Sequence, residues 1–165
     1  MNYPHIPWWQ RIIQRIATIK FISTGFLSKN LHRMDTAVLN WTHGRKNLTQ
    51  MLTGLPVVVI TTTGAKSGKP RTVPLAGLPD GEKIILVPTH FGQQHYPAWY
   101  YNLCANPTAQ VRQNGSTKVY IARTADQLEW DEYWDLAVHY YPGYQSYLER
   151  SGDREIPLFV LEPVK

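Results

Sequence analysis

The stretch PVVVITTTGAKSGKPRTVPLAGL, residues 56–78, decides the fold because it predicts a complete β-hairpin. Its first part, residues 56–63, is a run of β-branched residues that is apolar on both faces, which is typical of a strand inside a barrel or a covered sheet. Residues 64–69 then supply the glycines and polar residues of a turn. Residues 70–78 return as the partner strand, so this stretch predicts a β domain.

The turn of this hairpin is also a candidate anion site. A tight turn exposes backbone N–H groups, and cationic side chains add charge-assisted donors around them. The nucleotide-binding motif G-x-x-x-x-G-K-[ST] is excluded, because Gly64 and Gly68 are too close together and Pro70 stands where the magnesium-binding hydroxyl belongs. An ordinary solvated hairpin tip is the alternative interpretation. The cations on or beside the turn are Lys66, Lys69 and Arg71.

Short strands and turns continue along the rest of the chain. Residues 79–82 predict a turn in which proline sets φ and glycine takes the left-handed position. Asn114 and Gly115 predict a type I′ hairpin turn. About six short strands with few helices predict a small barrel. The later strands are expected at residues 83–89, 109–113, 117–123 and 156–161.

Two helices are expected to interrupt these strands. One covers residues 97–104, with Pro97 in its first turn, and the other covers residues 125–140. Thr124 and Gln127 have the spacing of a capping box at the start of the second helix.

Length and composition predict one structural domain with a hydrophobic core. The 165 residues are 43% hydrophobic and 12% aromatic, which argues against disorder. Within this domain we expect a basic amphipathic helical segment at residues 1–50 and the barrel at residues 51–165. The one cysteine, Cys104, cannot form an internal disulfide, and the N-terminus lacks the apolar run of a secretory signal, so a cytoplasmic location is expected.

The basic character of the chain is concentrated in the first 50 residues. They hold seven of the 17 Lys and Arg residues and one of the 12 Asp and Glu residues. The rest of the chain lacks the basic stripe interleaved with aromatics that is typical of nucleic-acid binding, so no nucleic-acid partner is expected. A helical wheel places six apolar residues on one face of an N-terminal helix: Trp8, Trp9, Ile12, Ile13, Ile16 and Ile19.

A tryptophan-rich apolar face with flanking cations is typical of a helix that lies in a membrane interface. Residues 8–22 are therefore expected to make peripheral contact with an anionic membrane. The alternative is a helix that covers the core of the domain itself. No stretch is long and apolar enough to span a bilayer.

Three stretches together resemble the deazaflavin-dependent nitroreductase (Ddn) family. They are TTTGAKSGKPRTVPL (residues 61–75), ILVPTHFGQQHYPAWYYNLCANP (residues 85–107) and WDEYWDLAVHYYPGYQSYLERSGDREIPLFVLEP (residues 130–163). The resemblance runs from about Phe21 to the C-terminus. It implies a split β-barrel of the FMN-binding type and coenzyme F-420, a flavin analogue with a phosphate and an oligoglutamate tail. It implies no metal.

The resemblance also implies which residues hold the coenzyme. In the family, the turn after the first barrel strand holds the phosphate and tail, while a later strand end and a short segment flank the ring system. Here the implied positions are Ala65, Lys66, Ser67, Lys69, Arg71, Thr72, Val73, Pro74, Leu75, Ala76, Val87, Pro88, Thr89, His90, Ala98, Trp99, Tyr100, Tyr101, Asn102 and Tyr144. Trp99 has a structural alternative as a plug of the barrel end, and Asn102 as a cap of a turn.

One departure from the family pattern concerns the segment after the strand at residues 83–89. Family members often read A-S-x-G-G where this chain has PTHFG. Thr89 keeps a hydroxyl at the serine position. Phe91 replaces a glycine, and its bulk is expected either to narrow the cavity or to remould the loop, which affects the substrate range more than coenzyme binding. His90 is expected to face solvent, with a cation near the coenzyme as the alternative.

Three tyrosines, Tyr141, Tyr144 and Tyr147, are implied to border the substrate pocket. Pro142 and Gly143 predict a break in the chain after Tyr141, so the segment is expected to form a bent wall. A phenol suits this place because it offers an apolar face and an O–H donor.

The activity implied by the resemblance is hydride transfer from reduced coenzyme F-420 to a quinone, a nitroaromatic or a similar activated acceptor. Tyr144 and Thr89 are the candidates for stabilising charge that develops on the acceptor. Quinones partition into lipid, which favours a location on the inner face of the cell membrane. Two other interpretations stay open: a split barrel that binds FMN or haem, and a non-catalytic fatty-acid- or lipid-binding protein. The sequence does not decide the oligomeric state.

Overall fold

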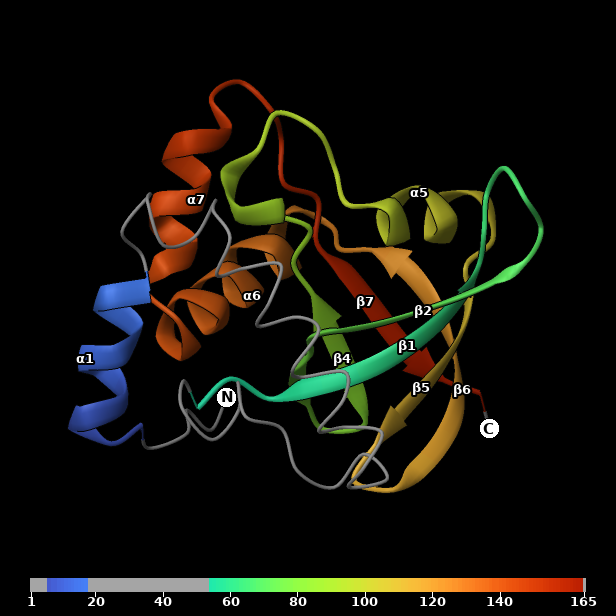
Figure 1. Ribbon diagram of the computed structural model, residues 1–165, viewed down its shortest axis with the longest axis horizontal. Coiled ribbons are helices and arrows are strands. Elements are labelled where there is room, and N and C mark those ends of the chain that lie inside the picture. The colour runs from blue at the N-terminus through green and yellow to red at the C-terminus, as the bar shows by residue number, and fades with distance from the viewer. Residues whose placement is uncertain (1–5, 18–53, 165) are drawn as a thin grey trace.

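A single curled antiparallel sheet forms the centre of the computed structural model, which describes residues 6–17 and 54–164 (Figure 1). The seven strands hydrogen-bond in the order β2-β1-β5-β6-β7-β4-β3. This architecture confirms the predicted mainly β class. The strands are β1 (Val57–Thr63), β2 (Pro70–Ala76), β3 (Leu78–Asp80), β4 (Lys83–Leu86), β5 (Thr108–Gln113), β6 (Ser116–Thr124) and β7 (Phe159–Pro163).

The sheet curls because its two edge strands are consecutive in the sequence. Only Gly77 separates β2 from β3, yet these strands lie at opposite edges of the sheet. Gly77 donates its N–H to the Pro56 carbonyl (3.0 Å). A Cβ at Gly77 would lie 2.7 Å from Val58 Cγ2 and 2.9 Å from Ile84 Cγ2, so side chains of β1 and β4, the strands next to the two edges, approach each other where only glycine fits.

Two strand predictions need correction. We expected about six strands, with one at residues 70–78 followed by a turn at residues 79–82, but Pro79 and Asp80 instead pair with β4 in a short seventh strand. Proline is tolerated there because β3 is an edge strand. The last strand, predicted at residues 156–161, is shifted towards the C-terminus and is β7.

Strands β4 and β7 are buried on both faces and therefore separate two hydrophobic layers. Ile84 and Leu86 of β4 face the barrel interior, together with Leu161 of β7. Ile85 of β4 and Val160 of β7 face the opposite side, where helices cover the sheet. This agrees with the continuous apolar run of covered strands.

Helices cover the outer face of the sheet and one end of the barrel. Helices α6 and α7 pack on the outer face, and α5 lies beside the β1–β2 turn (Figure 1). The predicted capping box, Thr124 with Gln127, is wrong, because Asp126 caps the N-terminus of α6 and Glu129 completes the box. The helices are α1 (Trp8–Ala17), α5 (Ala98–Ala105), α6 (Gln127–Tyr140) and α7 (Gly143–Ser151), with a short 3-10 turn η1 (His90–Gly92).

Helix α1 packs on the domain through its polar side. Gln14 is 1% exposed and donates Nε2 to the Tyr140 carbonyl at the end of α6 (2.9 Å). Trp8 is 76% exposed and Ile12 is 50% exposed, so these two apolar side chains point away from the core, whereas Ile13 is half-buried. Residues 18–22 of the predicted membrane-binding segment, and the predicted boundary at residues 50–51, lie outside the described residues.

Candidate functional site

The backbone of the β1–β2 turn, residues 64–69, is held by its own hydrogen bonds. Gly64 donates its N–H to the Lys69 carbonyl (2.9 Å), and Gly68 donates to the Gly64 carbonyl (2.8 Å). Gly68 has a φ of 63°, which glycine adopts without strain. A Cβ at Gly64 would lie 2.6 Å from Ser67 Oγ, so the turn is tightly closed.

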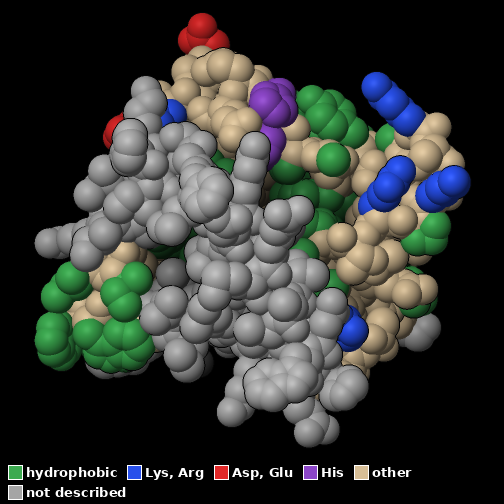
Figure 2. Space-filling view, in the orientation of Figure 1, with side chains coloured by type: hydrophobic (Ala, Val, Ile, Leu, Met, Phe, Trp, Pro, Cys, Tyr) green, Lys and Arg blue, Asp and Glu red, His purple; other side chains and the backbone are tan. Residues whose placement is uncertain are grey.

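The cations of this turn are exposed and available to an anion. Figure 2 shows Lys and Arg side chains gathered over the β1–β2 turn. Arg71 donates Nη2 to Ser67 Oγ (3.4 Å). Within the part of the chain that the structure describes, neither Arg71 nor Lys66 nor Lys69 forms an ion pair with a carboxylate. These donors suit a ligand with a phosphate and several carboxylates.

Predicted coenzyme positions continue along edge strand β2. Thr72 is exposed and shares a hydrogen bond with Thr61 between their Oγ1 atoms (2.8 Å). Val73 and Leu75 are half-buried against the barrel core. Pro74 and Ala76 are also half-buried, while Ala65, Lys66 and Ser67 of the turn are exposed.

Asn102 joins helix α5 to the turn. Its side chain is buried; Nδ2 donates to Thr62 Oγ1 (3.0 Å), and Oδ1 accepts from the Ala65 N–H (2.9 Å). Both ends of the amide are therefore engaged within the chain. Asn102 thereby fixes the turn that carries the cations, and its predicted contact with the coenzyme stays a prediction.

The aromatic residues of α5 divide between the barrel end and the surface. Trp99 and Tyr100 lie against Phe159 of β7, with ring centroids 6.3 and 5.6 Å away, so they close the barrel interior. Burial raises the pKa of Tyr100 to about 12. Tyr101 is 49% exposed, and Ala98 is exposed as well.

The segment that follows β4 is buried at its start and strained at its end. Val87, Pro88 and Thr89 are buried. His90 and Phe91 have φ values of 48° and 58°, a left-handed conformation that costs a residue with a Cβ about 1–2 kcal/mol.

His90 is half-buried, although we expected it to face solvent. Its Nδ1 donates to the His95 carbonyl (3.1 Å). Burial is the main cause that lowers its pKa below 6.5.

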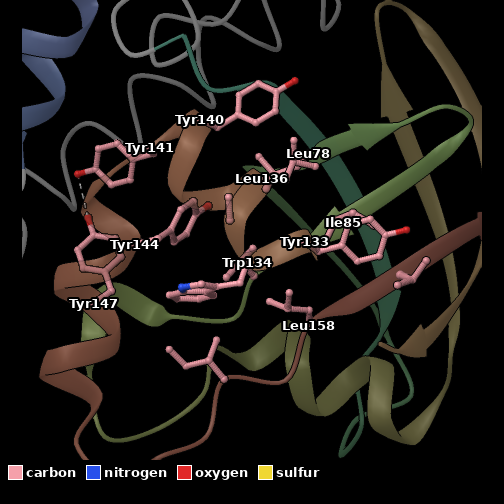
Figure 3. Close-up of a cluster of buried hydrophobic side chains, with 14 residues drawn as sticks. Leu78, Ile85, Tyr133, Trp134, Leu136, Tyr140, Tyr141, Tyr144, Tyr147 and Leu158 are labelled. Atoms are coloured by element: carbon pink, nitrogen blue, oxygen red, sulfur yellow. Dashed lines mark hydrogen bonds between the residues drawn. The ribbon is translucent and has the colours of Figure 1, made fainter. Parts of the chain in front are cut away.

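The three predicted pocket tyrosines form one buried cluster where α6 meets α7 (Figure 3). The chain breaks there as predicted, since α6 ends at Tyr140 and α7 begins at Gly143. Tyr141 and Tyr147 share a hydrogen bond between their hydroxyls (3.3 Å), and Tyr144 lies edge-on to both rings.

Phe91 joins this tyrosine cluster from the neighbouring segment. Its ring meets Tyr147 edge-on at 5.9 Å, while the side chain remains 43% exposed. The structure therefore brings together all four residues predicted to line the substrate pocket.

Two buried residues carry hydroxyls that remain available as hydrogen-bond donors. Thr89 and Tyr144 are 5% and 6% exposed, and neither hydroxyl forms a hydrogen bond with another described residue. Burial raises the pKa of Tyr144 well above 10, so its phenol stays protonated at neutral pH. These are the two residues predicted to stabilise charge on an acceptor.

Arg154 and Tyr96, to which no role was assigned from the sequence, connect the segment after β4 to helix α5. Arg154 donates to the Thr89 carbonyl (2.7 Å) and lies over the ring of Tyr96 (4.7 Å). Tyr96 in turn stacks on Tyr100 of α5 at 3.9 Å. An arginine in the polar stretch SGDRE looks like a solvated surface residue in sequence, and only its contacts reveal the link.

The opposite end of the barrel carries no predicted site residue. A cavity of about 310 Å³ lies there, and its lining includes Lys83, Asn114, Lys118 and Tyr120. In the described ranges, no group of three or more His, Cys, Asp and Glu side chains is suited to a metal ion. No helix of those ranges combines the length and apolar character needed to cross a bilayer.

Comparison with protein families gives one match that covers most of the chain. Residues 31–163 match the model of the F420H(2)-dependent quinone reductase family. An F420H(2)-dependent quinone reductase of Mycobacterium tuberculosis is 35% identical over 82 residues, which cover 49% of this chain and 54% of that protein. The chain thus spans about half the length of the curated relatives it matches.

Two solved structures are similar to this chain in fold. An F420-H2 dependent reductase is 41% identical, with a TM-score of 0.60, over 65% of this chain and 94% of that protein. A second structure, described as a domain-swapped dimer, is 35% identical with a TM-score of 0.63, over 82% of this chain and 98% of that protein. The predicted split-barrel fold is thereby confirmed.

Proposed function

The chain belongs to the F420H(2)-dependent quinone reductase family, and on this premise we propose that it transfers a hydride from reduced coenzyme F-420 to a quinone. Nitroaromatics and similar activated acceptors belong to the same proposal, because they also accept a hydride equivalent. The observation that supports it best is the β1–β2 turn, whose exposed cations have no carboxylate partner in the described residues.

The turn is suited to the anionic end of this coenzyme. Gly64 and Gly68 shape a turn whose side chains point outward, and Asn102 fixes it from α5. Lys66, Lys69 and Arg71 then supply charge-assisted hydrogen bonds to a phosphate and to a tail of carboxylates.

When bound, the reduced deazaflavin supplies the hydride. The contribution of the chain is to hold donor and acceptor face to face, exclude water and stabilise developing charge. The tyrosine cluster supports the exclusion of water, since Tyr141, Tyr144 and Tyr147 are each 6% exposed. The hydroxyls of Thr89 and Tyr144, which bind no other described residue, are the donors we assign to an acceptor oxygen, while solvent can deliver the proton.

The experiment is a fluorescence titration with coenzyme F-420, followed by oxidation of the reduced coenzyme by menadione. Lys66→Ala combined with Arg71→Ala is expected to raise the Kd for the coenzyme about ten-fold or more, because each charged hydrogen bond contributes about 1.5–3 kcal/mol when well made. The kcat at saturating coenzyme should fall much less, since the proposal assigns the turn to the phosphate and tail and other residues to the reacting ring.

Lys118→Ala is the matched control. Lys118 is an exposed cation at the opposite end of the barrel, 3.7 Å from Glu82. Its replacement should leave the Kd unchanged. An unchanged Kd in the double variant would show that Lys66 and Arg71 only face solvent. Saturation by FMN without binding of coenzyme F-420, or tight binding of fatty acid without any quinone turnover, would overturn the proposed function.

We also propose peripheral attachment to the inner face of the cell membrane through α1. The supporting observation is the orientation of the helix: Gln14 is buried against α6, whereas Trp8, Trp9 and Ile12 are 76, 41 and 50% exposed. Figure 2 shows hydrophobic side chains gathered over α1. Exposed tryptophans suit the headgroup region of a bilayer, and this location would bring a lipid-borne quinone near the enzyme.

A further inference from the structure

The backbone of residues 88–93 is strained. His90, Phe91 and Gly92 have consecutive left-handed φ values of 48°, 58° and 76°. Only Gly92 adopts this conformation without strain. Two local hydrogen bonds, from Gly92 to the Thr89 carbonyl (2.9 Å) and from Gln93 to the His90 carbonyl (3.1 Å), close the turn. Strain of this kind persists only where surrounding contacts outweigh it.

The guanidinium of Arg154 spans both ends of this segment. Nη2 donates to the Thr89 carbonyl (2.7 Å), Nη1 donates to the Pro88 carbonyl (3.3 Å) and Nε donates to the Gln93 carbonyl (2.9 Å). All three nitrogens therefore bind one short segment, which the fixed planar fork of arginine allows and an ammonium group does not.

One face of the guanidinium is covered by an aromatic ring. Arg154 lies 4.7 Å from the ring centroid of Tyr96, and the Tyr96 hydroxyl donates to the Glu155 carbonyl beside it (2.9 Å). Tyr96 stacks on Tyr100 at an interplanar angle of 15°. Arg154 has no carboxylate partner among the described residues, so its charge is directed to carbonyl groups of the segment.

We propose that Arg154 is a positioning residue, which holds residues 88–93 in their strained conformation and thereby places the Thr89 hydroxyl and the Phe91 ring at the acceptor site. The inference rests on the proposed function, because the acceptor site is part of it. Arg154 acts through the segment and contacts no reacting atom.

The first test measures the stability of residues 88–93 directly and does not depend on enzyme activity. In Arg154→Ala, amide hydrogen exchange at Gly92 and Gln93 is expected to accelerate at least ten-fold, because their hydrogen bonds close the turn that Arg154 holds. Arg154→Lys should give an intermediate rate, since it keeps the charge and part of the packing. Asp153→Ala is the control, since Asp153 is the exposed neighbour of Arg154, and it should leave the exchange unchanged.

The second test reads the consequence for the reaction. Arg154→Ala is expected to lower kcat about ten-fold or more, since misplaced groups lose rate rapidly. The Kd for coenzyme F-420 should change less than kcat does, because Lys66, Lys69 and Arg71 still bind the phosphate and tail, although residues 88–90 are predicted to flank the ring. Added guanidinium ion should restore part of the rate in Arg154→Ala but not in Arg154→Lys, where the lysine fills the site.

These outcomes separate the inference from the proposed function. If the wild-type chain neither binds coenzyme F-420 nor reduces a quinone, the proposed function fails, while the exchange result still decides whether Arg154 holds the segment. If the wild-type chain is active and Arg154→Ala leaves both the exchange at Gly92 and kcat unchanged, the positioning role is overturned.

Discussion

At the scale of single residues, Gly143 allows the tyrosine cluster to pack, because it lies under the ring of Tyr141. A Cβ at this position would overlap the Tyr141 ring. Alanine is favoured over glycine inside a helix by about 1 kcal/mol, but overlap in a packed core costs about 1–3 kcal/mol. Gly143→Ala must also displace Tyr141 from its hydrogen bond with Tyr147. We therefore expect a net loss of about 1–2 kcal/mol in the free energy of unfolding, measured by urea denaturation.

Gln145→Ala serves as the control for Gly143→Ala, because Gln145 is an exposed residue of the same helix. It should change the free energy of unfolding by less than about 0.5 kcal/mol. A stabilised Gly143→Ala variant would show that Tyr141 moves aside freely and that the cluster is not tightly packed.

Phe91 shows how far sequence reasoning reaches at this scale. The comparison of PTHFG with the glycine-rich family pattern identified Phe91 as a departure and placed it beside the substrate pocket. The structure adds that its backbone has a φ of 58° and that its ring meets Tyr147. Arg154 was not predictable as a support, because its partners are backbone carbonyls that lie more than sixty residues away in the sequence.

At the scale of elements, one cluster of charges joins α6 to two strands. Arg123 of β6 makes a bidentate ion pair with Glu129 at 2.6 Å and also contacts Glu162 of β7 at 3.1 Å. Glu129 accepts from the Asp126 N–H as well, which completes the capping box (3.1 Å). The hydrogen bonds from Arg123 lower the pKa of Glu129 from 4.5 to about 2.

This lowered pKa predicts a pH dependence. Because the folded chain binds a proton on Glu129 less readily than the unfolded chain, the stabilisation is complete above pH 4.5 and is lost as the pH falls towards 2. Arg123 is 40% exposed, so we expect Glu129→Gln to cost only about 1 kcal/mol at pH 7. The difference between the unfolding curves of the wild type and the variant should shrink as the pH falls from 4.5 and disappear near pH 2.

The control for Glu129→Gln is Glu132→Gln, an exposed change on the same helix that should leave the unfolding curve at pH 7 unchanged. A difference between Glu129→Gln and wild type that persists undiminished at pH 2 would show that packing, and not charge, explains the loss.

Element positions followed from the sequence more closely than element ends. The hairpin of β1 and β2 and the Asn114-Gly115 turn were predicted from local chemistry, and both exist. Strand β3 was not predicted, because Pro79 and Asp80 favour turns. They form a strand only through their pairing with β4. The cap of α6 was predicted at the wrong residue because Thr124 is the last residue of β6. Thr124 pairs there with Phe159 of β7.

At the scale of the whole molecule, the cationic turn and the exposed face of α1 lie on opposite sides. Figure 2 shows the Lys and Arg side chains over the β1–β2 turn at one side and the hydrophobic side chains over α1 at the other. Tyr140, whose carbonyl binds Gln14 of α1, directly precedes Tyr141 of the tyrosine cluster. This arrangement would keep the anionic coenzyme tail in water while the acceptor side faces lipid.

The proposed membrane attachment therefore predicts that changes on α1 reduce vesicle binding without reducing quinone turnover. Trp8→Ser combined with Ile12→Ser should lower the fraction of protein that sediments with anionic phosphatidylglycerol vesicles at least five-fold, because exposed apolar area and interfacial tryptophan supply the binding. Turnover of a water-soluble quinone should stay within two-fold of wild type. Leu128→Ser is the control, since Leu128 is 79% exposed on α6 and its loss should not affect sedimentation. Unfolding of the double variant would instead support a core-covering role, and unchanged sedimentation would exclude α1 as the membrane contact.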